Sequence, residues 1–157
     1  MTDYSTWPDA RINYHIACMT GCKLEVTPEY GSLPWLRLVD KNDSHIKDTD
    51  VTWGSMETRR QFWSWGLWAN DANMALKLLT DITVIECHPT TKPPLTWYMQ
   101  FVYYPAREVV GFETHVFAKS FPRALCECWL MWQDALNPLR QSADQPLPRT
   151  PRRHRAG

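Results

Sequence analysis

The strongest constraint on the fold comes from three strand-like segments that are joined by short connections. They cover residues 82–87, 96–104 and 109–118, and the last two alternate side chains of different character along the chain. A parallel pair of strands needs a crossover of about a dozen or more residues, and both connections are shorter than that. We therefore expect the three strands to form an antiparallel meander.

Helical periodicity marks three other segments. Residues 7–20, a segment that begins at Asn70 or Asp71, and residues 121–136 each place apolar side chains three or four positions apart. Between the first two, residues 23–39 hold two short alternating runs around a turn, and we expect two strands there.

Local signals define the expected ends of these elements. Thr6, Ser120 and either Asn70 or Asp71 are predicted N-caps, because their side-chain oxygens can accept a hydrogen bond from the first helical turn. Gly21 is a natural stop for the first helix, and Pro138 marks the predicted end of the last one. The polar residues 40–50 predict a loop.

The predicted order is helix, two strands, helix, three strands, helix. Helices that cover a mostly antiparallel sheet are typical of the α+β class. We expect a sheet of about five strands packed with three helices. A length of 157 residues corresponds to one domain.

The formal net charge is zero, but the charge is unevenly distributed. Residues 138–157 hold five arginines against Asp144, a net charge of +4, so the remaining residues carry −4. The same segment is rich in proline and has almost nothing to bury. We expect residues 1–137 to form a single α+β domain and residues 138–157 to form a flexible tail. Because an acidic body repels phosphate, only the tail is suited to non-specific binding of nucleic acid.

The sequence carries no recognisable targeting signal. Its first residues, MTDYSTWPDARINY, lack the basic and apolar regions of a signal peptide, and no apolar run reaches the roughly 18 residues of a membrane span. Five cysteines are an odd number, which fits reduced thiols better than a disulfide framework. We expect a cytoplasmic protein without a membrane partner.

From Trp68 onward, one helix opens as W-x-N-D-x-x-x-A-L-x-L-L, and the last helix opens with S-F-P-R-A-L-C-E-C-W-L after aromatic strands. This arrangement resembles the small phage and prophage proteins that contain a phage ABA sandwich domain. The opening segment DARINYHIACMTGC is similar to the first helix of that family, which ends in a glycine. Cys128 stands where the family usually has a small residue.

This resemblance implies an origin and a setting rather than an activity. The shared motifs are capping and packing signals, and the family provides no catalytic residues to carry over. The resemblance implies an accessory protein that acts in the bacterial cytoplasm during infection or lysogeny.

The cysteines and a nearby histidine are candidate metal ligands. His15, Cys18 and Cys22 follow one another at helical spacing, but structural zinc sites use tight cysteine pairs on turns. Cys126 and Cys128 are separated by one residue, which points their thiols apart on a helix. Buried free cysteines are the favoured interpretation, and we expect no metal and no cofactor.

A candidate acid–base cluster is the remaining feature that could support enzymatic activity. His115 and Glu113 share one face of a predicted strand, and Glu86 and His88 could accompany them. A solvated sheet face explains the same pattern without chemistry, and it is the favoured interpretation. We expect no catalytic residues and no enzymatic activity.

The aromatic content is the most unusual feature, with nine tryptophans, six tyrosines and five phenylalanines. Most of these rings are expected in the core, but an exposed aromatic patch usually marks an interface. The best candidate combines arginines with rings, a composition that is enriched at interaction hot spots. The predicted binding residues are Arg59, Arg60, Phe62, Trp63 and Trp65.

The leading hypothesis is a non-enzymatic phage or prophage accessory protein that binds a host protein and modulates or counters bacterial defence. The alternative is a nucleotide-binding or nucleic-acid-binding protein that uses the same aromatic and arginine patch together with the basic tail.

Overall fold

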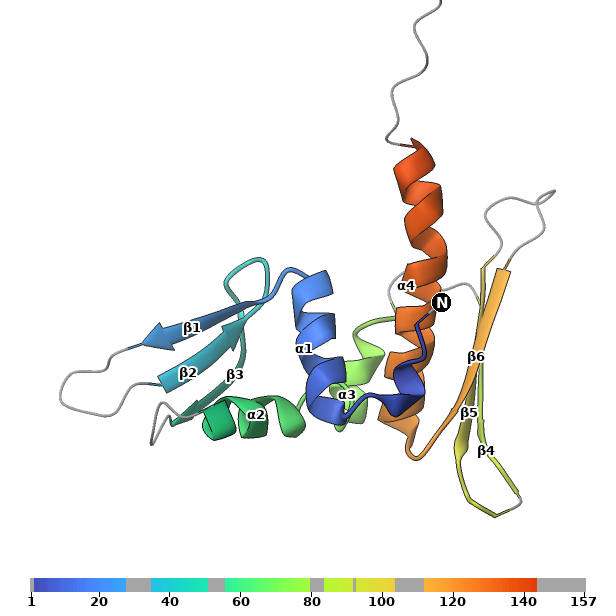
Figure 1. Ribbon diagram of the computed structural model, residues 1–157, viewed down its shortest axis with the longest axis horizontal. Helices are drawn as coiled ribbons and strands as arrows, with labels where there is room; N and C mark the ends of the chain where they lie inside the picture. Colours follow the sequence, from blue (N-terminus) through green and yellow to red (C-terminus); the bar gives the residue numbers. More distant parts are fainter. Residues whose placement is uncertain are drawn as a thin grey trace, which may run out of the picture.

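The computed structural model describes residues 2–27, 35–50, 56–79, 84–91, 93–103 and 112–143. In chain order its elements are η1 (Tyr4–Thr6), α1 (Asp9–Met19), β1 (Lys23–Thr27), β2 (Trp35–Val39), β3 (His45–Asp50), α2 (Met56–Ser64), α3 (Ala72–Leu76), β4 (Val84–Pro89), β5 (Trp97–Tyr103), β6 (Phe112–Ala118) and α4 (Phe121–Ala143). Figure 1 shows α1, α3 and α4 between two sheets, with α4 next to the second one.

The strands form two antiparallel sheets, with the orders β1-β2-β3 and β4-β5-β6. The predicted meander is confirmed: Met99 of β5 lies opposite Cys87 on one side and Val116 on the other. The α+β class is also confirmed. The predicted sheet of about five strands with three helices is corrected to two three-stranded sheets with four α-helices in the described part of the chain.

Residues 40–50 were predicted as a loop, and this prediction is wrong for their second half. β3 pairs with β2, so that Lys47 lies opposite Leu38 and Thr49 opposite Leu36. The strand sequence HIKDTD lacks an apolar alternation, because β3 lies at the edge of the first sheet. Its conformation therefore comes from the backbone ladder to β2 rather than from local propensity.

Two helices also differ from the prediction. The sequence did not predict α2, which lies in the tryptophan-rich stretch before α3. α4 continues to Ala143, past the predicted end at Pro138. The packed residues before Pro138 already hold the helix, so the loss of one backbone N–H group does not end it. Residues 144–157 of the predicted tail lie outside the described residues.

The predicted C-terminal end of α1 is confirmed, and its predicted N-cap is wrong. Gly21 has a φ of +76° and its N–H group donates to the carbonyl of Cys18, as expected for a glycine that stops a helix. Thr6 is not the N-cap: it belongs to η1, and α1 begins after Pro8 without a side-chain cap. The predicted caps of the later helices are confirmed, because Asp71 and Ser120 accept hydrogen bonds from the first turns of α3 and α4.

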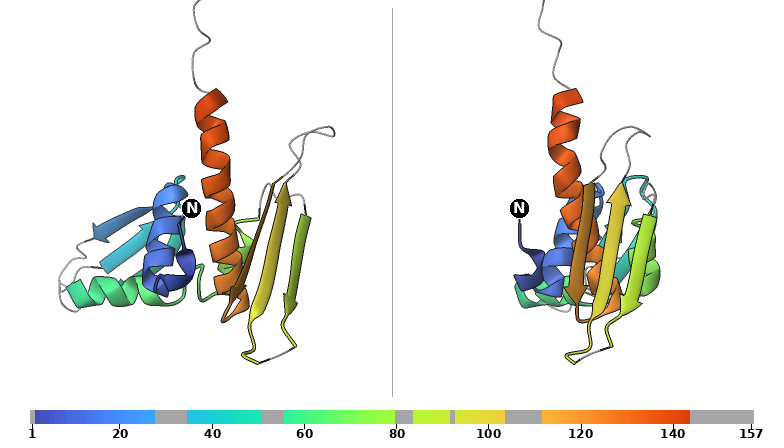
Figure 2. Two further views of the ribbon diagram at one scale, coloured as in Figure 1. Left: turned by 45° about the vertical axis from the view of Figure 1, so that its right-hand side comes forward. Right: turned by 90° about the vertical axis from the view of Figure 1, so that its right-hand side faces the viewer.

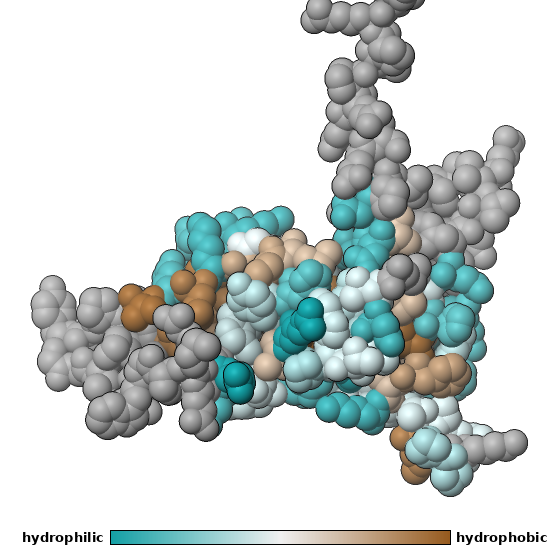
Figure 3. Space-filling view, viewed as in Figure 1, coloured by the Kyte–Doolittle hydropathy of each residue, from teal (hydrophilic) through white to brown (hydrophobic). Residues whose placement is uncertain are grey.

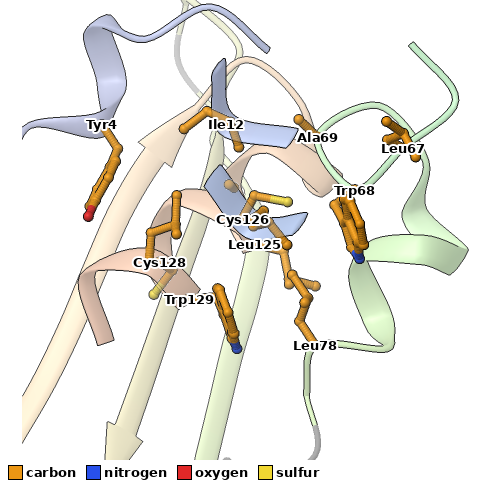
Figure 4. Packing of buried hydrophobic residues seen from close by; sticks show 14 of the residues in the cluster. Tyr4, Ile12, Leu67, Trp68, Ala69, Leu78, Leu125, Cys126, Cys128 and Trp129 are labelled. Carbon is orange, nitrogen blue, oxygen red and sulfur yellow. The ribbon is translucent and has the colours of Figure 1, made fainter. Parts of the chain in front are cut away.

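One face of the second sheet packs against α4. Alternate residues of its strands turn inward, and Met99 and Phe101 are fully buried there. Residues 123–130 of α4 are all buried, because the sheet covers one side of the helix while α1 and α3 cover the other. Figure 4 shows Leu125 of α4 near Trp68 and Leu78. In the right-hand view of Figure 2 the opposite face of the sheet is open toward the viewer.

A buried asparagine joins α1 to the segment between α2 and α3. Asn13 is fully buried, and its side-chain amide donates to the carbonyl of Trp63 at 2.7 Å and to Oδ1 of Asn70 at 3.1 Å. Its Oδ1 accepts the N–H group of Ala69 at 2.8 Å. The amide thus satisfies backbone groups of a turn that lies inside the molecule.

A buried arginine joins the N-terminal segment to α4. Arg123, whose side chain is 4% exposed, donates to Oε1 of Glu127 and to Oδ1 of Asp9, both at 2.7 Å. It also donates to the backbone carbonyls of Tyr4 at 2.8 Å and Trp7 at 2.6 Å. Lys119 pairs with the same Asp9 from the surface, with its own side chain 71% exposed.

We predict that Arg123→Met lowers the free energy of unfolding by about 3–5 kcal/mol, because it leaves a buried carboxylate and two backbone carbonyls without their donor. Lys119→Met is the matched control: it removes the exposed ion pair to Asp9, and its expected cost is at most about 1 kcal/mol. Chemical denaturation of both variants measures the difference. Equal and small losses would contradict a structural role for the guanidinium.

Candidate functional site

α2 and the turn after it carry the predicted binding residues, and the structure divides them into two groups. Phe62 and Trp63 are 2% and 8% exposed, so their rings belong to the core. Arg60 is exposed and Trp65 is 61% exposed. The side chain of Arg59 lies outside the described residues.

The two buried rings hold α2 in place. The ring of Trp63 contacts that of Phe62 and, on α1, that of Tyr14, both edge to face with centroids 5.2 Å apart. The carbonyl of Trp63 accepts the buried amide of Asn13. Trp63 therefore fixes α2 against α1 and is not available to a partner in this conformation.

Lys47 of β3 positions the exposed ring of Trp65. Its Nζ donates to the carbonyl of Phe62 in the last turn of α2 at 2.7 Å and to that of Trp65 just after the helix at 2.8 Å. The same Nζ lies 4.2 Å from the ring centroid of Trp65 and 4.6 Å from that of Phe62, in cation–π geometry. Burial lowers the pKa of the Lys47 ammonium. Gly66 follows with a φ of +67°, which turns the chain away.

The neighbours of Trp65 on α2 complete an exposed surface, here called the Trp65 surface: Arg60, Gln61, Ser64 and Trp65. These residues are all exposed, and their spacing of three and four positions places them on one side of the helix end. The hydroxyl group of Ser64 donates to the carbonyl of Arg60 at 2.6 Å. The surface thus offers a fixed aromatic ring and an exposed arginine side chain.

The histidines and glutamates of the acid–base hypothesis meet on the open face of the second sheet. Glu86 lies 3.6 Å from His88 between Oε1 and Nε2, and Glu113 accepts a hydrogen bond from Gln100 at 2.8 Å. His88 stacks on the ring of Tyr98, with centroids 4.9 Å apart. The four charged or titratable side chains, Glu86, His88, Glu113 and His115, are all exposed. The exposure of these four side chains favours the interpretation of a solvated sheet face over that of an acid–base cluster.

Two of the five cysteines are buried in the core and are poorly suited to thiol chemistry. All five are free, and Cys126 and Cys128 are buried. Burial raises the pKa of both thiols, that of Cys128 to about 11, which keeps them protonated and unreactive. Among the described residues, no three His, Cys, Asp or Glu side chains gather as metal ligands.

Comparison with known proteins gives no relative: a scan of protein families, a search of curated proteins and a search of solved structures each found no match. The resemblance to phage ABA sandwich proteins stays a prediction. In the described part of the chain, no helix has the length and apolar character needed to cross a membrane.

Sequence reasoning missed the lysine that positions Trp65. Lys47 lies in the segment that was predicted as a loop, and it reaches α2 only because β3 pairs with β2. No local pattern in HIKDTD marks this lysine. The polar residue Asn13 inside the apolar stripe of the first helix was the one visible signal for a buried hydrogen-bonding role.

Truncation of the two tryptophans of the predicted site should change the stability of the protein by very different amounts. Trp63→Ala removes a buried ring and should cost about 3–5 kcal/mol of stability. Trp65→Ala removes an exposed ring and should change stability by less than about 0.5 kcal/mol. Chemical denaturation monitored by far-ultraviolet circular dichroism tests both. A large loss from Trp65→Ala would place that ring in the core instead.

Proposed function

We propose that this protein is a binding module without a catalytic role, and that the Trp65 surface contacts a partner protein. The observation that carries the proposal is the exposure of Trp65 together with its fixation by Lys47. Tryptophan and arginine dominate interface hot spots, and both stand on this surface. A ring held in place before binding loses little conformational freedom on association.

Apolar side chains on β1 add support for a protein partner. Leu24 and Val26 lie opposite the buried residues Leu38 and Leu36 of β2, but they are themselves 37% and 55% exposed. Figure 3 shows hydrophobic side chains gathering where β1 lies. Exposed apolar groups that cluster on one region favour a protein interface.

The resemblance to phage ABA sandwich proteins supplies the proposed setting. In this setting the protein is a phage or prophage accessory protein in the cytoplasm of a bacterial host. Its partner is a host factor, and binding modulates or counters bacterial defence. No step of this proposal requires a metal or a cofactor.

Nucleotide or nucleic-acid binding is the second candidate. An exposed tryptophan and an exposed arginine on one surface suit a stacked base as well as a protein. The predicted body charge of −4 opposes a polyanion, and most of the basic tail, residues 144–157, lies outside the described residues. This candidate therefore ranks below a protein partner.

Quantitative affinity capture from a lysate of a bacterial host tests the proposal. The wild-type chain should retain a protein in stoichiometric amount, and Trp65→Ala should lose at least about nine tenths of it through loss of the aromatic anchor. Leu76→Ala is the matched control, because Leu76 is an exposed apolar residue on α3 outside the Trp65 surface.

Equal capture by the wild-type chain and Trp65→Ala would contradict the assignment of the surface. Co-purifying nucleotide, seen as a high absorbance at 260 nm that Trp65→Ala removes, would replace the proposal with the second candidate.

A further inference from the structure

β6 lies at an edge of the second sheet. Within the described residues β5 pairs with one side of it and no strand pairs with the other. The outer side of such a strand presents a row of backbone N–H and C=O groups, which is a template for another strand. β6 covers seven residues, long enough to pair with a short extended peptide.

Two neighbouring cavities run along this open edge. The first has a volume of about 330 Å³ and the second about 220 Å³. Ser5, Phe117 and Glu127 line both, so the cavities form one continuous groove, here called the β6 groove. Figure 2 shows the N-terminal segment on the side of β6 that faces away from β5. The groove therefore lies between a strand edge and the segment that Arg123 anchors.

The charge of the β6 groove is negative. Asp3, Asp9 and Glu127 line it, against the two cations Lys119 and Arg123. The guanidinium group of Arg123 is already bound to Glu127, Asp9 and two backbone carbonyls.

Glu127 is the buried member of this acidic set. Its side chain is 5% exposed, yet it lines both cavities, and Arg123 bonds to only one of its oxygens, Oε1. Burial raises the pKa of this carboxyl, and the charges of Asp3 and Asp9 add to the rise. A positive group placed next to Glu127 would favour its charged form and so oppose both effects.

The walls of the groove can cover the apolar stem of a cationic side chain. Phe117, which is 58% exposed, lines both cavities, Met131 lines the first and Trp7 lines the second. Arginine and lysine bury their methylene groups on such surfaces while their charged ends reach a carboxylate. The combination of an open strand edge, apolar walls and a buried carboxylate is therefore suited to one kind of ligand.

We propose that the β6 groove binds an extended peptide segment of a partner protein, which adds a strand to β6 and places an arginine or lysine side chain next to Glu127. Main-chain hydrogen bonds provide affinity in this mode, and the side-chain pocket provides selectivity. This inference goes beyond the Trp65 surface, because it uses other elements and holds or fails independently of it.

Fluorescence anisotropy with a defined probe tests the proposal. The probe is a fluorescein-labelled peptide with blocked ends and the sequence Thr-Val-Thr-Arg-Thr-Val-Thr, and we expect saturable binding to the full chain. Exchange of its arginine for glutamate should weaken binding by at least about tenfold. Methylation of alternate backbone nitrogens should do the same, because it removes the ladder hydrogen bonds but keeps the charge.

Two variants locate the probe on the protein. Ser5→Arg places a cation at an exposed position that lines both cavities, and it should weaken binding by at least about tenfold. Asn73→Arg adds the same charge at an exposed position on α3 and should leave binding unchanged. Both should keep the wild-type melting temperature, so that a loss of binding reports the groove. Hydrogen exchange of residues 112–118 should slow when the probe binds.

Four results would overturn the proposal: no binding of the probe, equal binding of the methylated probe, equal binding of the glutamate probe, or equal loss in the two arginine variants. Light scattering adds a fifth test. A monomer that binds one probe is expected, whereas a dimer that excludes the probe would mean that a second copy of this chain occupies the β6 edge.

Discussion

A buried guanidinium group joins two parts of the chain that lie far apart in the sequence, the N-terminal segment and α4. Arg123 of α4 bonds to the carboxylates of Glu127 and Asp9 and to the carbonyls of Tyr4 and Trp7. The two carbonyls belong to the N-terminal segment, whose Tyr4 side chain is also buried and donates to Asp134 of α4. Since a planar guanidinium group offers its donors in fixed directions, the bonds also fix the angle of this segment against α4. The position of the N-terminal wall of the β6 groove follows from this geometry.

Buried polar groups also join elements on the other side of α1. Asn13 satisfies backbone groups of the turn between α2 and α3, and the edge-to-face contact of Trp63 with Tyr14 holds α2 on α1. α2 in turn presents Trp65, whose ring and carbonyl are held by Lys47 of β3. Buried polar groups thus set the relative placement of the elements, while the apolar core supplies most of the driving force.

Much of the local structure could be predicted from the sequence, because its signals are local. Gly21 and Asp71 set helix ends through their own backbone and side-chain geometry, and the short connections of the last three strands leave only an antiparallel arrangement. β3 could not be predicted, because a polar strand such as HIKDTD exists only through its pairing with β2. The division into two sheets is a consequence of tertiary packing that no window of sequence contains.

The candidate site could likewise be predicted only in part from the sequence. The sequence identified a stretch of arginines and rings, and the structure exposes Arg60 and Trp65 while it buries Phe62 and Trp63. Which ring faces the core depends on the direction of α2, and that helix was not predicted. Lys47 comes from another element altogether, so its role required the fold.

The anchoring of the N-terminal segment by Arg123 is the central physical claim, and nuclear magnetic resonance of the arginine side chains tests it most directly. The Nε–H group of Arg123 donates to a buried carboxylate, so its hydrogen exchange should be at least about a hundredfold slower than that of the exposed Arg60. Arg123→Lys assigns the resonance by its disappearance. Exchange of the Arg123 Nε–H group at the rate of Arg60 would contradict this anchoring, because it would mean that the guanidinium group is solvated and does not hold the N-terminal segment.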